Sequence, residues 1–316
     1  MSADPFETAG TQPRAPRVVR FAGGEMIGDR YQLVRLLGRG GMGEVWEADH
    51  ATLARRVALK LVRLDAADAR ARLLHEARIL ASLRHPSIVA VHDAGITPEG
   101  IAYLAMDVLA GESLAARIDR GRLEVRTGVA IVLELLAGLE AAHAAGIIHR
   151  DIKPDNVLLV PRGDDFAPTL IDFGISVPGG ATADTAGTPQ YMAPEQVRGA
   201  VNDERTDVWA CCMTLYEAVT GRAPFVGEDL ASTVQRVLDG ALPYPTDVPG
   251  MDGRLWRILT RGLRKAPADR FPSVRELRAA LIEWLARPPT APPLPPPPAP
   301  PPAPSAFEAA IRKKLT

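Results

Sequence analysis

Two polar runs joined by an apolar segment decide how this chain folds. They are His149-Arg150-Asp151-Ile152-Lys153-Pro154-Asp155-Asn156 and Ile171-Asp172-Phe173-Gly174. The apolar residues from 157 to 160 predict a short strand, and a turn follows them. The resulting hairpin would hold two carboxylates, one ammonium and one amide in neighbouring loops.

These residue types suit the transfer of a phosphoryl group to a hydroxyl. That reaction needs a carboxylate to orient the nucleophile and accept its proton, oxygen ligands for magnesium, and a cation beside the phosphate. Asp151, the pair Asn156 and Asp172, and Lys153 match these needs in that order. The order and spacing resemble the catalytic loop and DFG motif of eukaryotic-type (Hanks-type) protein kinases, in particular the bacterial members of that family.

A glycine-rich stretch lies far upstream of the two runs. Residues 31–37 predict a strand, four glycines fall within residues 38–43, and a second strand is expected from Val45. Glycines allow a tight turn and a close approach of backbone N–H groups to an anion. Because the stretch joins two strands and opens no helix, it does not fit a dinucleotide-binding fold. An ordinary glycine-rich hairpin is the alternative for this stretch taken alone.

The next strand, residues 56–62, alternates. Val57, Leu59 and Leu61 are expected on one face, with Ala58 and Lys60 on the other. A small alanine beside a lysine suits a cleft for adenine and phosphates. An exposed lysine on a sheet face is the alternative reading of the pattern.

A helix is expected over residues 68–83. Glu76 lies within its apolar stripe, which Leu73, Ala77, Leu80 and Ala81 form. A carboxylate on a buried face needs a partner, and Lys60 is the candidate. The kinase resemblance implies the same ion pair. A Glu76 at the solvated edge of the stripe is the alternative. Two more strands are expected over residues 87–92 and 101–108.

The resemblance implies an ATP site with Mg²⁺, or Mn²⁺ in its place. Lys60 and Glu76 would belong to the catalytic set with Asp151 and Lys153, and Met106 would be the gatekeeper. The backbones of Asp107 and Leu109 would bond the adenine edge. The remaining implied ATP-binding residues are Leu37, Gly38, Arg39, Gly40, Gly41, Met42, Gly43, Glu44, Val45, Ala58 and Leu158.

The Asp-x-Lys-Pro-x-Asn form of the loop resembles the Ser/Thr-specific branch of the family. Arg150 would then be the pocket for an activation-loop phosphate, since a phosphate opposite a guanidinium can order a loop. Within residues 175–195 we hypothesise that Thr182 and Thr185 are autophosphorylation sites. Thr188 is implied to be structural. An unregulated loop is the alternative.

Two further features complete the match. A helix is expected from Thr206 to Gly221, where Asp207 would brace the catalytic loop, and Glu195 would pair with Arg270. Cys212 stands where the family usually has glycine, a departure that concerns packing. The histidines at 75, 85, 92 and 143 show no metal-ligand spacing and are interpreted as structural.

The composition agrees with a large soluble domain. The 316 residues are 47% hydrophobic and 24% charged, with a formal net charge of −1, which gives no reason to expect nucleic acid as a partner. The adjacent cysteines, 211 and 212, predict buried thiols rather than a disulfide or a metal site. No targeting segment or membrane span is apparent, and a cytoplasmic location is expected.

The sequence thus predicts an α+β, two-lobed protein kinase fold, with a small antiparallel-sheet N-lobe that carries one main helix and a larger helical C-lobe. The expected divisions are 1–28 disordered, 31–287 kinase domain (N-lobe 31–108, C-lobe 111–287), 288–304 proline-rich linker and 305–316 amphipathic helix. A pseudokinase would lack one of the catalytic residues. A small-molecule phosphotransferase would lack the segment that ends in Ala193-Pro194-Glu195.

The expected partners are protein substrates, together with a transient homodimer for trans-autophosphorylation. The tail suggests a further partner. Twelve of the 17 residues from 288 to 304 are proline, which favours an extended rod. A spacer and a PxxP ligand are both open readings of this rod. The short helix expected after it would be a docking peptide for the kinase itself or for another protein.

Overall fold

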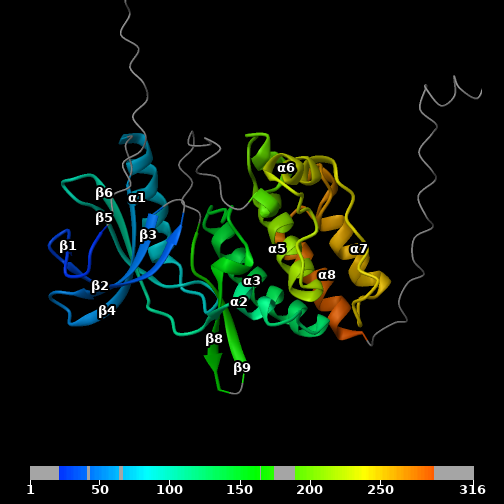
Figure 1. Cartoon of the computed structure of the whole chain (residues 1–316), viewed down its shortest axis with the longest axis horizontal. Coiled ribbons are helices and arrows are strands. Elements are labelled where there is room, and N and C mark those ends of the chain that lie inside the picture. The colour runs from blue at the N-terminus through cyan, green and yellow to red at the C-terminus, as the bar shows by residue number, and fades with distance from the viewer. Residues whose placement is uncertain (1–20, 41–42, 64–66, 164, 174–188, 288–316) are drawn as a thin grey trace, which may run out of the picture.

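The computed structural model describes residues 21–40, 43–63, 67–163, 165–173 and 189–287. The chain forms two lobes, with a sheet and one long helix in the first and mainly helices in the second (Figure 1). The predicted two-lobed α+β fold is therefore confirmed.

The N-lobe is a six-stranded antiparallel sheet in the order β1-β2-β3-β4-β6-β5. Its strands are β1 (Met26–Ile27), β2 (Tyr31–Gly40), β3 (Gly43–His50), β4 (Arg55–Arg63), β5 (Val91–Ile96) and β6 (Ile101–Met106). Helix α1 (Ala67–Ser82) connects β4 to the segment before β5 and packs against β5.

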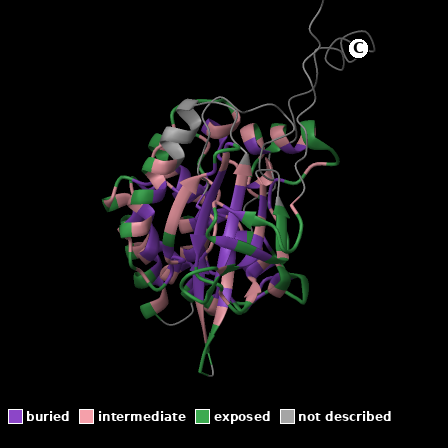
Figure 2. Ribbon diagram, turned by 90° about the vertical axis from the view of Figure 1, so that its left-hand side faces the viewer, coloured by how far each residue is buried: buried purple, intermediate pink, exposed green. Residues whose placement is uncertain are grey.

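The alternation expected in β4 is present. Val57, Leu59 and Leu61 are buried in a cluster on one face of the sheet, while Ala58 joins the main core on the other face. Figure 2 shows the buried residues running along the strands, with exposed residues at the turns. This arrangement leaves Lys60 on the same face as Ala58, toward the second lobe.

The C-lobe begins with a three-stranded sheet in the order β7-β8-β9, formed by β7 (Glu112–Ser113), β8 (Val157–Arg162) and β9 (Asp165–Leu170). Its α-helices are α2 (Leu114–Asp119), α3 (Val125–Ala144), α4 (Pro194–Val197), α5 (Glu204–Thr220), α6 (Leu230–Asp239), α7 (Gly253–Gly262) and α8 (Val274–Ala286). Three short 3-10 turns are η1 (Pro154–Asn156), η2 (Pro189–Tyr191) and η3 (Pro267–Asp269).

Helix α5 runs through the core of this lobe. Most of its side chains are buried, and Gly221 caps its C-terminus in a left-handed conformation with φ +74°. The long helix α3 packs against both α5 and α8. Helix α3 ends at Ala144, and Gly146 turns the chain with φ +79°. The polar run that follows starts beside α5, because the His149 N–H donates to Asp207 of that helix.

Two expectations about the N-lobe need correction. The strand predicted over residues 87–92 is instead β5, which begins at Val91, and only an isolated bridge from Ile88 to Leu170 precedes it. The structure also describes residues 21–28, which were expected to be disordered. Met26–Ile27 pairs with β2 because Ile27, which is 2% exposed, fills the cluster around Tyr31.

Candidate active site

The polar run that begins at His149 is fixed to helix α5 by Asp207. The Asp207 carboxylate is fully buried and accepts hydrogen bonds from the backbone N–H groups of His149 at 2.8 Å and Arg150 at 2.9 Å. Arg150 has φ +65°, an uncommon conformation for a residue with a side chain. The two bonds to one carboxylate stabilise this bend directly before Asp151.

Asp207 has a third partner, His143 at the end of α3. The sequence reasoning interpreted His143 as structural but did not find this contact. Its Nε2 lies 2.7 Å from Asp207 Oδ2, and its Nδ1 lies 3.4 Å from the Glu204 carboxylate. Burial alone would lower the pKa of His143, but the hydrogen bond and charge of Asp207, with the charge of Glu204, outweigh burial and raise it. The spacing of 64 residues to Asp207 gave no sequence signal.

His149 has a different role in the same loop. Its ring is fully buried, and its centroid lies 4.5 Å from that of the tilted ring of Phe173, which lies in the second polar run. Burial lowers the pKa of His149 and favours the neutral imidazole, whose Nδ1 accepts the Asp151 N–H at 3.3 Å. The contact between the two rings ties the two polar runs together.

Asp151 lies between a lysine and an amide. Lys153 Nζ contacts its two carboxylate oxygens at 3.2 and 3.0 Å. Asn156 Nδ2 donates to Asp151 Oδ2 at 2.9 Å and to the Asp151 carbonyl at 2.7 Å. Oδ2 thus accepts two close bonds and Oδ1 only the longer one, which leaves Oδ1 free capacity to accept a further proton donor.

The second run lies directly beside the first. Ile171 N–H donates to the Asn156 carbonyl at 3.1 Å, so Asp172 follows immediately after the residue that contacts the catalytic loop. Asp172 is also the residue that meets the N-lobe, because its Oδ1 contacts the ammonium of Lys60. Two side-chain contacts, Lys60 with Asp172 and Asn156 with Asp151, are therefore linked by the backbone bond from Ile171 to Asn156, and they form one group across the two lobes.

Glu76 faces this group from α1. Its Oε1 lies 4.0 Å from the guanidinium of Arg150, and each side chain is 28% exposed. The ammonium of Lys60 donates a hydrogen bond to the Asp172 carboxylate. The Lys60–Glu76 pair stays a prediction, and Arg150 is one contact of the Glu76 carboxylate.

The glycine-rich hairpin lies next to Lys60. Val45 on β3 pairs with Lys60 on β4, and a Cβ at Gly43 would lie 2.0 Å from the Leu61 carbonyl, so only glycine fits there. Glu44 binds both strands of the hairpin, because its carboxylate accepts from Arg39 Nε at 2.9 Å and from Trp46 Nε1 at 2.8 Å. Arg39 and Glu44 thus bond each other in this structure.

Four of the residues predicted to line the adenine pocket belong to the main core or pack against it near the connection between the lobes. Ala58 and Met106 belong to the main core, and Val45 and Leu109 pack against it. The Asp107 N–H donates to the Ala90 carbonyl at 3.1 Å, which leaves the Asp107 carbonyl as its free edge group. Leu37 and Gly38 lie on β2 and Leu158 lies on β8, and their place in the pocket stays a prediction.

Asn156 and Asp172 fit a hard divalent cation. Both offer oxygen ligands, which magnesium prefers. Asn156 is 8% exposed and its amide nitrogen is used by Asp151, so its amide oxygen is the atom left for a metal. Among the described residues, no group of three or more His, Cys, Asp or Glu side chains forms a separate metal site.

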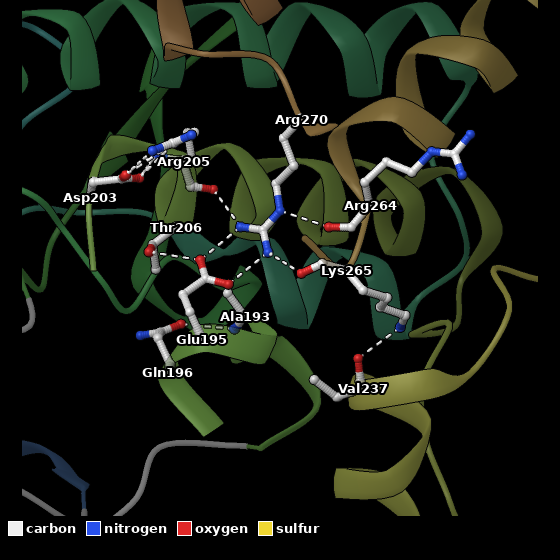
Figure 3. A network of polar contacts seen from close by, with 10 residues as sticks. All are labelled: Ala193, Glu195, Gln196, Asp203, Arg205, Thr206, Val237, Arg264, Lys265 and Arg270. Carbon is white, nitrogen blue, oxygen red and sulfur yellow. Dashed lines mark hydrogen bonds and ion pairs between the residues drawn. The ribbon is translucent and has the colours of Figure 1, made fainter. Parts of the chain in front are cut away.

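The segment Ala193-Pro194-Glu195 is fixed to the core by an ion pair (Figure 3). Arg270 binds Glu195 through two bonds of 2.7 Å, and both side chains are buried. Its remaining N–H groups donate to the carbonyls of Arg264, Arg205 and Lys265 at 2.8, 2.9 and 3.2 Å. The contact implied by the resemblance is present.

Gln196 connects this segment to the catalytic loop and was not found from the sequence. Its Nε2 donates to the Arg150 carbonyl at 2.8 Å, while its Oε1 accepts from the Ala193 N–H at 2.8 Å. A second missed pair is Tyr191, whose hydroxyl donates to Glu217 at 2.6 Å. Burial raises the pKa of that carboxyl group.

Several predicted residues lie outside the part of the chain that the structure describes. They are Gly41 and Met42 of the hairpin, Thr182, Thr185 and Thr188 of the loop, and both tail segments, 288–304 and 305–316.

The adjacent cysteines are both buried and free, as expected. Burial raises the pKa of both thiols, that of Cys212 to about 12. A Cβ at Gly262 would lie 2.2 Å from Cys212 Sγ. The cysteine at the position where the family usually has glycine is thus matched by a glycine on the facing helix.

Comparison with known proteins agrees with this geometry. The protein kinase domain family matches residues 31–276. The serine/threonine-protein kinase PknH of Mycobacterium bovis is 38% identical over 278 residues, which cover 84% of this chain and 45% of that protein. PknE of Mycobacterium tuberculosis is 40% identical over 263 residues, covering 79% and 45%. PknD of the same species is 41% identical over 261 residues, covering 79% and 39%.

The chain therefore belongs to the protein kinase family, and it resembles its bacterial serine/threonine members. It spans less than half the length of these relatives. Within the described residues, none of the helices has both the length and the apolar character needed to cross a membrane.

Proposed function

We propose that this protein is a serine/threonine protein kinase that transfers the γ-phosphate of ATP to protein hydroxyl groups. The connected group of Lys60, Asp172, Asn156 and Asp151 is the observation that carries the proposal. It joins a strand of one lobe to two loops of the other through the contacts of the Lys60 ammonium with Asp172 and of Asn156 with Asp151. These are the residue types that phosphoryl transfer to an alcohol requires.

Asp151 is assigned as the base. A substrate hydroxyl would approach Oδ1, which has the free capacity, and its proton would pass to the carboxylate as oxygen attacks phosphorus. The bond to the leaving ADP oxygen breaks in the same displacement. The Lys153 ammonium, 3.0 Å from Asp151 Oδ2, lies where it can also neutralise the transferring phosphoryl group.

The other residues bind and orient the nucleotide. Lys60 would contact the α- and β-phosphates, and the glycine-rich hairpin would cover them with backbone N–H groups. Asn156 and Asp172 would hold Mg²⁺, or Mn²⁺ in its place, which when bound neutralises phosphate charge. Ala58, Met106 and Leu158 would contact the adenine, with the Asp107 carbonyl and the Leu109 N–H on its polar edge.

A labelled-ATP assay tests the proposal. Incubation of the purified protein with γ-labelled ATP, magnesium and a generic basic protein substrate should place label on serine or threonine. Asp151→Asn and Lys60→Met should each reduce transfer by a factor of about a thousand or more while the protein stays folded. Asp165→Asn, which changes an exposed carboxylate on the β8–β9 hairpin, is the matched control and should be as active as wild type. Full activity of both site variants would refute the assignment.

Regulation through Arg150 is a further part of this proposal. Arg150 lies at the bend of the catalytic run, 28% exposed, and faces one carboxylate at 4.0 Å. A phosphate on Thr182 or Thr185 carries about −1.5 to −2 charges and would compete for this guanidinium. Phosphopeptide mapping of active protein should find at least one of these threonines modified; active protein with neither modified would remove this part.

The tail and the dimer rest on the sequence alone. A proline-rich rod that ends in a short amphipathic helix suits a docking segment for this kinase or for a partner, and a transient dimer suits trans-autophosphorylation. Deletion of 288–316 should lower activity or remove a co-purifying partner. A deletion variant equal to the full chain in both respects would make the tail a spacer only.

A further inference from the structure

A basic groove is lined by residues of α7 and α8. These two helices lie at the end of the C-lobe away from the N-lobe sheet (Figure 1). The groove has a volume of about 340 Å³ and contains four arginines, Arg254, Arg257, Arg261 and Arg287, against one carboxylate, Glu283. Since the whole chain has a net charge of −1, this excess of positive charge is local. None of these residues belongs to the proposed phosphoryl-transfer site.

Two of the arginines are neutralised within the protein. Arg254 binds the buried carboxylate of Asp252 through Nε at 3.1 Å and Nη2 at 3.0 Å. Arg287 contacts Glu283 one turn before it on α8. The positive charge that remains in the groove is therefore that of Arg257 and Arg261.

Arg257 and Arg261 form no ion pair with any residue that the structure describes. They are both exposed and lie one turn apart on α7, where two like charges destabilise a helix slightly. The Arg261 guanidinium is held in place because it lies 4.3 Å above the ring of Phe271. Two neighbouring guanidinium groups that pair with no described carboxylate, one of them held in place by a ring, make a ready site for carboxylates.

The spacing and the floor of the groove favour a peptide over a free anion. Residues four apart on a helix are separated by about 6 Å along its axis. Alternate residues of an extended chain lie about 6.6 Å apart on one side, which matches this separation. The groove also has apolar contacts in Ile258, Ala280 and Trp284, which a small anion would not use.

We propose that this groove docks an acidic, extended segment of a partner protein. Two of its alternate carboxylates would bind Arg257 and Arg261, and an apolar side chain would contact Ile258 and Ala280. The chain's own continuation does not suit the groove. Although it starts at the groove after Arg287, residues 288–307 contain no acidic residue, and residues 312–314 are basic.

Fluorescence anisotropy with the full-length protein tests this proposal. The probe is a fluorescein-labelled peptide in which glutamate alternates with alanine around one central leucine. Wild type should bind it saturably, with a Kd below about 1 mM, and should not bind the matched peptide with lysine in place of glutamate. Arg257→Glu and Arg261→Glu should each weaken binding by about tenfold or more.

Arg275→Glu is the matched control, because Arg275 is an exposed arginine of α8 that does not line the groove. It should bind the peptide within about twofold of wild type, since an exposed charge outside the contact acts mainly at long range. The thermal midpoint of each variant is measured. Because the Arg257 side chain has no ion-pair partner among the described residues, Arg257→Glu keeps the test valid if loss of the Arg261–Phe271 contact perturbs the fold.

Three results would overturn the proposal. They are the absence of saturable binding by wild type up to about 1 mM peptide, equal binding by wild type and Arg257→Glu, and displacement of the peptide by inorganic phosphate at the same concentration as by unlabelled peptide. The last result would identify a simple anion site without affinity for a chain.

Discussion

Replacement of Arg270 by methionine should destabilise the protein strongly. The guanidinium makes two bonds to Glu195 and three to backbone carbonyls, all within a buried site (Figure 3). Removal of one partner of a buried ion pair costs about 3–5 kcal/mol, because an uncompensated charge remains. Against a typical domain stability of about 5–15 kcal/mol, this is a large part of the total.

A double-mutant cycle separates the pair from its surroundings. Glu195→Gln removes the carboxylate charge but keeps an oxygen acceptor for the Thr206 hydroxyl, which lies 3.0 Å away. When Arg270→Met is added, the two costs should not sum, since neither charge is then left alone. We expect a coupling free energy of at least about 2 kcal/mol between the two substitutions.

Equilibrium unfolding in urea, followed by tryptophan fluorescence, measures these free energies. Trp209 is a suitable reporter, because the Arg270 guanidinium lies 5.0 Å from the centre of its ring. Arg222→Met is the control. Its partner Asp247 is 3.1 Å away, but both side chains are more than half exposed, so the cost should be below about 1 kcal/mol. A cost for Arg270→Met as small as that of the control, or strictly additive costs, would refute the reasoning.

Three other substitutions give separate tests. Asp207→Asn should lower the free energy of unfolding by about 2–3 kcal/mol and should lower phosphotransfer. In wild type a carboxylate oxygen accepts each of two backbone N–H groups, whereas in the variant the amide nitrogen would face one of them without accepting its bond. Equal unfolding midpoints of the two proteins in urea would contradict this. Gly262→Ala should lower the free energy of unfolding by about 1–3 kcal/mol, because the added methyl group would overpack against Cys212. Adding Cys212→Ala should restore most of that free energy in the same assay, and no restoration would exclude this clash. In His143→Gln, the stabilisation from the raised pKa is lost. The free energy of unfolding of wild type should exceed that of the variant most below pH about 6.5, and the difference should shrink as pH rises through the folded-state pKa of His143. A difference in unfolding free energy that grows with pH would contradict this prediction.

The sequence predicted best those parts in which neighbours along the chain decide the structure. The alternation from Val57 to Leu61 predicted both faces of β4, because side chains of a strand point to opposite faces in turn. The apolar run of α5 and the glycine that caps it likewise placed that helix within a few residues. Both patterns are local and need no knowledge of the rest of the fold.

Contacts between distant segments were predicted only where the family resemblance supplied them. The Glu195–Arg270 pair joins residues 75 apart, and composition or periodicity alone would not have paired them. The contacts of His143 with Asp207 and of Gln196 with Arg150 have no motif of their own, so they became visible only in the folded chain. The strand at Val91–Ile96 was misplaced for a related reason, since its start depends on pairing with β6.

The polar contacts also predict how a change far from the nucleotide would reach the catalytic loop. Arg270 binds Glu195, and the next residue, Gln196, donates to the Arg150 carbonyl, one residue before Asp151. Loss of the buried pair should therefore let this loop shift as well as weaken the fold. Arg270→Met, assayed at a temperature at which it is fully folded, should show a lower kcat, whereas Arg222→Met should not. If folded Arg270→Met keeps the wild-type kcat, the Gln196 bond does not position Asp151.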